Sequence, residues 1–404
     1  MKGRFTLSTC TLAISALLSA AAFSAETKEY SASQQAVRIA QETIIVDGHI
    51  DVPYRVKEKW VDVTKATDGG DFDYPRAVKG GLNAPFMSIY VPASLDNSPE
   101  STQLAHELID SVEAIVARAP NKFAIATSPS QVKAQFEQGL ISLPMGMENG
   151  SPIQGSLDNL KAFYERGIRY ITLAHSQANH ISDSSYDLRR KWKGLSPFGK
   201  TLVTEMNNIG IMLDISHVSD AAFYQVIELT KVPVIASHSS LRRFTPGFER
   251  NMNDDMIKKL GENGGVVMIN FGSSFVSKAA GQWRTELTNA RKALIEQEGE
   301  DSPKLENFDE NYRKEVPYPY STLDEVLDHI DHVVKLVGVE HVGIGSDYDG
   351  VGDSLPIGLK DVASFPNLVQ GLLDRGYQRN DIEKILSGNV LRVWQQVEDY
   401  AAAH

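Results

Sequence analysis

The chain has 404 residues, of which 42% are hydrophobic and 23% charged, so it can bury one large core or two ordinary ones. Its formal net charge of −12 at pH 7 disfavours a polyanionic partner such as a nucleic acid, whereas a small substrate is untouched by this argument. Aromatic residues make up 8% of the chain, which excludes wholesale disorder.

Residues 1–25 predict a signal peptide. Lys2 and Arg4 give a positive start, and the apolar run 11–23 precedes small residues suited to cleavage. The run is shorter than the ~20 residues that a membrane span needs, which disfavours the alternative of an uncleaved anchor. We therefore expect an exported chain, periplasmic or secreted, whose mature part 26–404 has no membrane span.

The only cysteine, Cys10, lies inside this leader, so the mature chain has none. A disulfide, a thiol nucleophile and a cysteine-ligated metal are therefore excluded. Any metal must be held by His, Asp and Glu. Removing the leader takes away two cations and no anion, which leaves 38 basic against 52 acidic residues and a formal net charge of −14.

Eight short apolar segments alternate with helical stretches. They are nearly continuous apolar runs, which is typical of parallel strands buried on both faces. Eight such strands in about 300 residues predict a single-domain α/β fold, a (β/α)8 TIM-like barrel, with an open doubly wound sheet as the alternative. The expected strands are Thr43–His49, Asn83–Val91, Ile141–Glu148, Ile168–His175, Gly210–His217, Val232–His238, Gly264–Phe271 and His341–Asp347.

Signals for helix starts lie between these strands. Thr322-Leu-Asp-Glu325 is a capping-box pattern. Ser156, Ser219 and Asn253 are the expected N-caps of three further helices. This alternation of strand and helix signals is what the barrel requires.

The connection 272–321 is long and polar, and we expect it to carry a helix over Gln282–Glu298. Long connections of this kind are often lids or interface elements, and both roles stay open. His329 and His332 lie off the apolar stripe of the helix that follows, so we expect them on a solvated face.

Ligand-capable residues stand where the apolar runs stop. In a barrel the strand ends converge on one face, where catalytic groups sit. A single strand-end histidine is more often structural, but so many on different strand ends predict one joint site. The candidates are His49, Asp51, Glu148, His175, His217, His238 and Asp347.

Imidazoles and carboxylates together suit a borderline metal such as zinc. Glu148 offers a carboxylate that could bridge two ions, so the set suits two metals that share it and one water. Zinc lowers the pKa of water from ~15.7 to ~7, which would supply a hydroxide for amide hydrolysis. Asp347 is the candidate proton shuttle, and His175 is the candidate stabiliser of the oxyanion.

A set of motifs occurs in the order of one known family. They are VDGHID (Val46–Asp51), MEN (Met147–Asn149), RYITLAHS (Arg169–Ser176), GLSPFGK (Gly194–Lys200), LDISHVS (Leu213–Ser219), IASHSS (Ile235–Ser240), RNMNDD (Arg250–Asp255), GIGSDYDG (Gly343–Gly350) and LSGNVLRV (Leu386–Val393). Together they resemble the renal (membrane) dipeptidase family of zinc peptidases, in the amidohydrolase superfamily. The resemblance covers nearly the whole mature chain.

The resemblance implies a zinc-dependent dipeptidase with two Zn²⁺ per chain, which hydrolyses free dipeptides, L,D-dipeptides included, by a metal-bridging hydroxide. It implies that His49 and Asp51 hold one zinc. His217 and His238 would hold the other, and Glu148 would bridge both. Members of the family are often dimers, so the resemblance also implies a homodimer.

The resemblance further assigns three residues to the substrate. His175 would contact the scissile carbonyl and steady the tetrahedral intermediate. Arg250 would bind the C-terminal carboxylate of the dipeptide, as a guanidinium does through two parallel hydrogen bonds. Asp347 would move the proton and face the free amine of the substrate.

Two departures from the family pattern affect specificity. Glu148 is followed by Asn-Gly where the family has an EGG-like segment, and Arg242 and Arg243 compete with Arg250 as carboxylate anchors. Two other functions therefore stay open. One is a related barrel hydrolase acting on another amide or a lactone, and the other is a non-catalytic binding protein.

Overall fold

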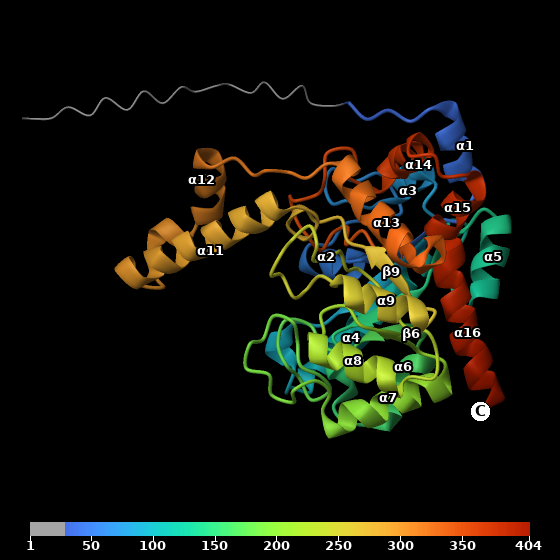
Figure 1. The fold of residues 1–404 in the computed structure, drawn as a ribbon, viewed down its shortest axis with the longest axis horizontal. Helices are drawn as coiled ribbons and strands as arrows, with labels where there is room; N and C mark the ends of the chain where they lie inside the picture. The colour runs from blue at the N-terminus through green and yellow to red at the C-terminus, as the bar shows by residue number, and fades with distance from the viewer. Residues whose placement is uncertain (1–28) are drawn as a thin grey trace, which may run out of the picture. The chain divides into compact units, whose positions relative to one another are not determined.

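Eight parallel strands close into a barrel in the computed structural model, which describes residues 29–404 (Figure 1). The order around the sheet is β1-β10-β9-β8-β7-β6-β5-β2. The predicted barrel is therefore confirmed, and the open-sheet alternative is wrong. The barrel strands are β1 (Val46–Ile50), β2 (Ala84–Tyr90), β5 (Met145–Glu148), β6 (Ile168–Thr172), β7 (Met212–Asp214), β8 (Ile235–Ala236), β9 (Val266–Ile269) and β10 (Val342–Ile344).

Each predicted strand contributes one barrel strand, but the third is divided at Pro144. The residues before it form β4 (Ile141–Leu143), which pairs in parallel with β3 (Phe123–Ile125) in a separate two-stranded sheet. Proline cannot donate a ladder hydrogen bond, so the chain changes sheets there. No strand was predicted at β3, which has only three residues.

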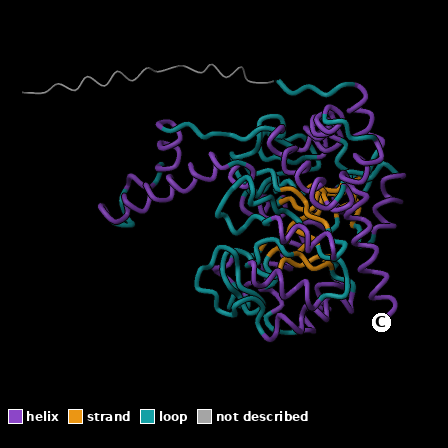
Figure 2. Tube along the Cα trace, in the orientation of Figure 1, coloured by secondary structure: helices purple, strands orange, loops and turns teal. Residues whose placement is uncertain are grey.

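Helices surround the strands, which lie at the centre of the fold (Figure 2). The side chains of Ser156, Ser219 and Asn253 each accept a helix N-terminal hydrogen bond, and Thr322 forms the predicted capping box. The helices are α1 (Gln34–Glu42), α2 (Val52–Glu58), α3 (Tyr74–Gly80), α4 (Glu100–Arg118), α5 (Pro129–Glu137), α6 (Leu157–Glu165), α7 (Pro197–Ile209), α8 (Asp220–Leu229), α9 (Asp254–Glu262), α10 (Ser273–Val276), α11 (Lys278–Glu298), α12 (Phe308–Glu315), α13 (Leu323–Val337), α14 (Phe365–Asp374), α15 (Arg379–Glu383) and α16 (Asn389–Ala403).

The core fills the end of the barrel at which the strands begin. Trp394 of α16 packs its ring 5.3 Å from that of Phe86, which lies 5.2 Å from the ring of Tyr170. All three side chains are fully buried. These packed aromatic rings leave the opposite end of the barrel to polar side chains.

The long connection 272–321 carries more helix than predicted. α11 begins at Lys278 rather than Gln282, because Ser277 caps its first turn. In Figure 1, α11 and α12 extend outward from the barrel. Within residues 29–404, no helix combines the length and the apolar character needed to cross a bilayer. The predicted signal peptide, 1–25, lies outside the described residues.

The prediction of a solvated face for His329 is wrong. This side chain is fully buried; its Nδ1 accepts a hydrogen bond from Leu241 N, and its Nε2 donates one to Val276 O. Burial lowers the pKa of His329 to about 4, so the ring is neutral. His332 is mostly buried as well, and its Nε2 lies 2.9 Å from Asp254 Oδ1.

Candidate metal centre

The predicted ligand residues lie together at the carboxyl ends of the barrel strands. His49 belongs to β1, and Asp51 follows this strand as the N-cap of α2. Glu148 is the last residue of β5. The remaining residues stand two or three positions beyond β6, β7, β8 and β10, namely His175, His217, His238 and Asp347. Parallel strands ending at one rim bring residues far apart in the sequence into contact.

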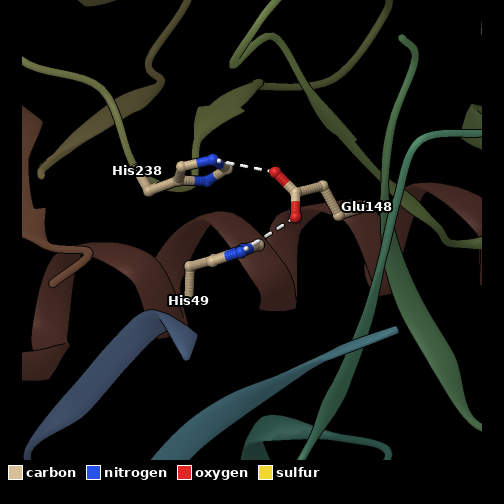
Figure 3. Close-up of side chains that lie close together, drawn as sticks. All are labelled: His49, Glu148 and His238. Atoms are coloured by element: carbon tan, nitrogen blue, oxygen red, sulfur yellow. Dashed lines mark ion pairs between the residues drawn. The ribbon is translucent and has the colours of Figure 1, made fainter. Parts of the chain in front are cut away.

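The carboxylate of Glu148 is the centre of this cluster (Figure 3). Its Oε2 lies 3.3 Å from His49 Nε2, which is also 3.4 Å from Asp51 Oδ2. Its Oε1 lies 3.1 Å from His217 Nε2 and 3.2 Å from His238 Nε2. One oxygen of Glu148 thus faces the His49–Asp51 pair, and the other faces the His217–His238 pair.

The chemistry of these donors fits metal ions. His49 Nε2 and Asp51 Oδ1 are buried without a hydrogen-bond partner in the described chain, an arrangement that costs about 1–3 kcal/mol per polar group. Ions at the cluster would satisfy such atoms. Three overlapping groups of ligand atoms each lie within 4.8 Å of one another: His49, Glu148 and His238; Glu148, His175 and His217; and His49, Asp51 and Asp347.

The protonation states of His217, His238 and Glu148 also suit metal binding. Burial and the positive charge of Arg250 hold the pKa of His217 well below its usual value. Burial and the neighbouring His49 do the same to the pKa of His238. Burial alone would raise the pKa of Glu148, but the surrounding histidines hold it well below its usual range. Neutral imidazoles and a charged carboxylate are the forms that bind metals. Burial alone would lower the pKa of His49, but Tyr170, Glu148 and Asp51 raise it well above its usual value, so metal binding there must release a proton.

A buried aspartate that the sequence analysis missed holds β1 against the loop after β10. Asp47 accepts hydrogen bonds from Ser346 N at 2.9 Å, from Ser346 Oγ at 2.5 Å and from His49 N at 3.2 Å. Because Ser346 precedes Asp347, this carboxylate fixes the spacing between a ligand candidate and the proton-shuttle candidate. Asp47 lies two residues before His49 on the same strand, and this spacing was the feature of the sequence that could have identified it as part of the site.

A second missed aspartate, Asp214, orients His238. The hydroxyl of Ser237 donates to Asp214 Oδ2 at 2.6 Å and lies 2.7 Å from His238 Nδ1. Thr172 Oγ1 also donates to Asp214, at 2.5 Å. Ser237 is thereby left to accept the Nδ1 proton of His238, which turns the lone pair of Nε2 toward Glu148. Outer hydrogen bonds of this kind set the tautomer of a ligating histidine.

Tyr170 plays the corresponding part for His49, since its hydroxyl lies 2.8 Å from His49 Nδ1. We expect Tyr170→Phe to weaken metal affinity by about 10- to 100-fold, because it removes this partner while keeping the ring. Competition with a chromophoric chelator measures the affinity. Tyr348→Phe is the control: Tyr348 is equally buried, but its hydroxyl bonds to Leu359 O. Equal affinities in the two variants would contradict the assignment.

Two of the site residues have left-handed backbones. His217 has φ 68° and Asp347 has φ 64°. Non-glycine residues pay about 1–3 kcal/mol for sparsely populated conformations, which gather at functional sites. The strain is consistent with side chains that are placed for chemistry rather than for stability.

A cavity of about 730 Å³ opens in front of the cluster. Asp51, Glu148, His175, His217 and Asp347 all line it. Asp347 Oδ2 accepts a hydrogen bond from Asn270 at 2.7 Å. Burial, together with the negative Asp51 and Glu148, raises the pKa of Asp347 to about 7. Burial also lowers the pKa of His175, so this ring is neutral at neutral pH and can donate a proton in a hydrogen bond.

Arg250 lies behind His238 and is only 3% exposed. It donates to His238 O and to Ser239 Oγ, both at 2.7 Å, while its Nε has no hydrogen-bond partner in the described chain. The competing Arg242 is held by Asp220 through two bonds of 2.7 and 2.6 Å, and Arg243 is exposed. Arg250 is thus the buried arginine beside the cluster.

Comparison with known proteins gives one consistent result. The sequence profile described as membrane dipeptidase (peptidase family M19) matches residues 33–404. An uncharacterized dipeptidase of Schizosaccharomyces pombe is 31% identical over 371 residues, which cover 88% of this chain and 81% of that protein. The crystal structure of the probable dipeptidase PvdM from Pseudomonas aeruginosa is 26% identical with a TM-score of 0.76, covering 91% of this chain and 98% of that one. The metallopeptidase called dipeptidase AC is 25% identical with a TM-score of 0.73, covering 88% and 98%.

Proposed function

This chain belongs to the membrane dipeptidase family and is a metallo-dipeptidase, and we propose that two zinc ions at the Glu148 cluster serve its hydrolysis of free dipeptides. The observation that carries the proposal is the position of Glu148, which turns one carboxylate oxygen to each of two ligand pairs. When bound, two zinc ions supply a water nucleophile at neutral pH and polarise the scissile carbonyl.

The ligand roles follow from these contacts. His49 and Asp51 would hold one ion, His217 and His238 the other, and Glu148 both. Two divalent cations against the two carboxylates of this set leave an excess of positive charge that suits a substrate carbonyl oxygen. The histidines and carboxylates without cysteine support zinc as the metal.

The remaining site residues would act on the substrate. Asp347, which lines the cavity beside Glu148, would take a proton from the attacking water and pass it to the leaving amine. His175, neutral and facing the cavity, would donate a hydrogen bond to the developing oxyanion. Arg250 would bind the C-terminal carboxylate of the dipeptide.

Metal removal tests the proposal. We expect exhaustive chelation to abolish hydrolysis of L-Ala–L-Ala, and we expect added zinc to restore it with two ions bound per chain. Elemental analysis measures the metal content, and amine release measures turnover. Because the imidazoles must be neutral to bind, zinc should also be lost more readily at acid pH. Full hydrolysis after complete chelation would refute the metal mechanism.

Arg250 separates a dipeptidase from a hydrolase of other amides. We expect Arg250→Ala to lower kcat/KM for L-Ala–L-Ala by about 10- to 100-fold, mainly through KM, because charge-assisted bonds to the carboxylate are lost. The same variant should barely change hydrolysis of L-alanyl-L-alaninamide, which lacks that carboxylate. Equal losses on both substrates would favour the other amide hydrolase.

We also propose that the enzyme is exported by its N-terminal leader, which the positive start and the apolar run support. The homodimer and the acceptance of a C-terminal D-residue, both implied by the resemblance, stay predictions. A dipeptide series, L,L against L,D, tests the second.

A further inference from the structure

The connection 272–321 forms part of the wall of the catalytic cavity. From α11 it contributes Trp283, Arg284 and Leu287, and from α12 and the segment after it Arg313 and Tyr318. The first half of the predicted helix therefore lines the cavity. The metal ligands lie at the strand ends, where the scissile bond would be. The residues of the connection would therefore contact the parts of a substrate that lie farther from that bond.

Two arginines, Arg284 and Arg313, give the outer wall of the cavity a positive charge. Inside, the carboxylates of Asp51, Glu148 and Asp347 belong to the metal centre. Outside, Arg313 lies over the rings of Tyr318 at 4.7 Å and Trp283 at 5.3 Å. Its carboxylate partner is Asp353 at 3.2 Å, whose side chain is 71% exposed.

Arg284 has no carboxylate within ion-pairing distance anywhere in residues 29–404. Its contact is with the ring of Tyr186, 5.9 Å from its Cζ. Tyr186 in turn lies 6.0 Å from the ring of His217. Arg284 and Tyr186 also line a second cavity of about 590 Å³, where the charged neighbours are Lys278 and Glu286. An unpaired guanidinium thus stands where the two cavities meet.

The position of Arg284 also indicates which end of a substrate it would meet. Arg284 contacts Tyr186, and Tyr186 contacts His217, so Arg284 lies on the side of the cavity that His217 lines. Arg250, the proposed anchor of the C-terminal carboxylate, lies on that side too, because its Cζ is 5.5 Å from the ring of Phe275, which lines the same cavity. The residue nearest Arg284 would therefore be the C-terminal residue of the dipeptide.

We infer that Arg284, with Arg313 in the wall of the same cavity, forms a subsite for an acidic side chain on the C-terminal residue of the dipeptide. This inference rests on the proposed dipeptidase function. A glutamate side chain would supply the carboxylate that Arg284 lacks, whereas the isosteric glutamine would bring no charge. Because Arg284 is exposed and screened by solvent, the preference is about 3- to 10-fold.

The test compares matched dipeptides on the zinc-loaded full chain. We expect kcat/KM for Ala-Glu to exceed that for Ala-Gln by about 3- to 10-fold, with either stereoisomer of the second residue, and the ratio to fall as salt is added. Arg284→Gln should bring the ratio close to one, mainly by lowering kcat/KM for Ala-Glu. Arg291→Gln, on the same helix but paired with Asp309 outside the cavity, should leave the ratio unchanged.

Three outcomes would overturn the inference. They are a ratio of one or less in the unmodified enzyme, an unchanged ratio in Arg284→Gln, and a preference that appears only when glutamate is the first residue. Hydrolysis of Ala-Ala keeps this failure separate from that of the proposed function. If Ala-Ala and Ala-Gln are cleaved without a preference for Ala-Glu, the subsite alone is wrong. If a zinc-loaded enzyme cleaves none of them, the dipeptidase proposal is wrong as well.

Discussion

Glu148→Gln is expected to remove both the metal ions and the activity. The substitution keeps the shape of the side chain but takes away the one negative charge that lies within 3.3 Å of three histidine nitrogens. We expect the metal content to fall from two ions to fewer than one per chain. We expect kcat/KM for a dipeptide to fall by at least about 10³-fold, since no activated water remains.

The loss must be separated from misfolding. Glu58→Gln, an exposed substitution of the same kind on α2, should keep both the metal and the activity. Circular dichroism should show the same helix content in both variants, because the barrel core lies apart from the carboxylate. A Glu148→Gln protein that retains two ions and normal turnover would remove the basis of the two-metal proposal.

The barrel could be predicted because its strands are buried on both faces. Val266–Ile269 is buried at every position and contains only apolar residues, which is typical of a strand in the interior. Ile168–Thr172 is equally buried, although it includes Arg169. The site could be predicted for a related reason. Six of the eight apolar runs stop at a ligand-capable residue, and a closed parallel sheet brings those ends to one rim.

What escaped prediction depends on contacts between distant segments. The periodicity of α13 places His329 off the apolar stripe, but the segments at Leu241 and Val276 cover that face and satisfy both ring nitrogens. A helix does not encode which loop will lie on it. The same holds for Arg284 on α11: nothing in a polar connection shows that it folds back onto the cavity.

The supporting aspartates show a different limit. Asp47 and Asp214 are fully buried and lie within three residues of a proposed ligand, so residue type and position alone do not distinguish them from ligands. Only the structure separates them from the ligands, because their oxygens are occupied by hydroxyl and backbone donors. A carboxylate with its lone pairs in use orients neighbours, whereas the carboxylate of Asp51 keeps a buried oxygen free.

Asp347→Asn should stop turnover and leave the metal ions in place. Asparagine is isosteric and tolerates the left-handed backbone, φ 64°, better than most residues, so the substitution removes the proposed proton acceptor with little strain. A positioned acid–base group contributes about 10²- to 10⁴-fold, and we expect a loss of this size in kcat with a small change in KM. Stopped assays with a sensitive amine probe measure the residual rate, and elemental analysis measures the metal.

Asp349→Asn provides the matched control two residues away. Asp349 also has a left-handed backbone, φ 66°, but its carboxylate bonds to Asp71 N and lies 3.3 Å from the guanidinium of Arg55. Its loss should leave kcat within a few-fold of normal. Normal turnover in Asp347→Asn would assign the proton transfer to another group, and loss of metal there would make Asp347 a ligand. A protein that only binds dipeptides has no turnover to lose, so the pair of variants also separates an enzyme from a binding protein.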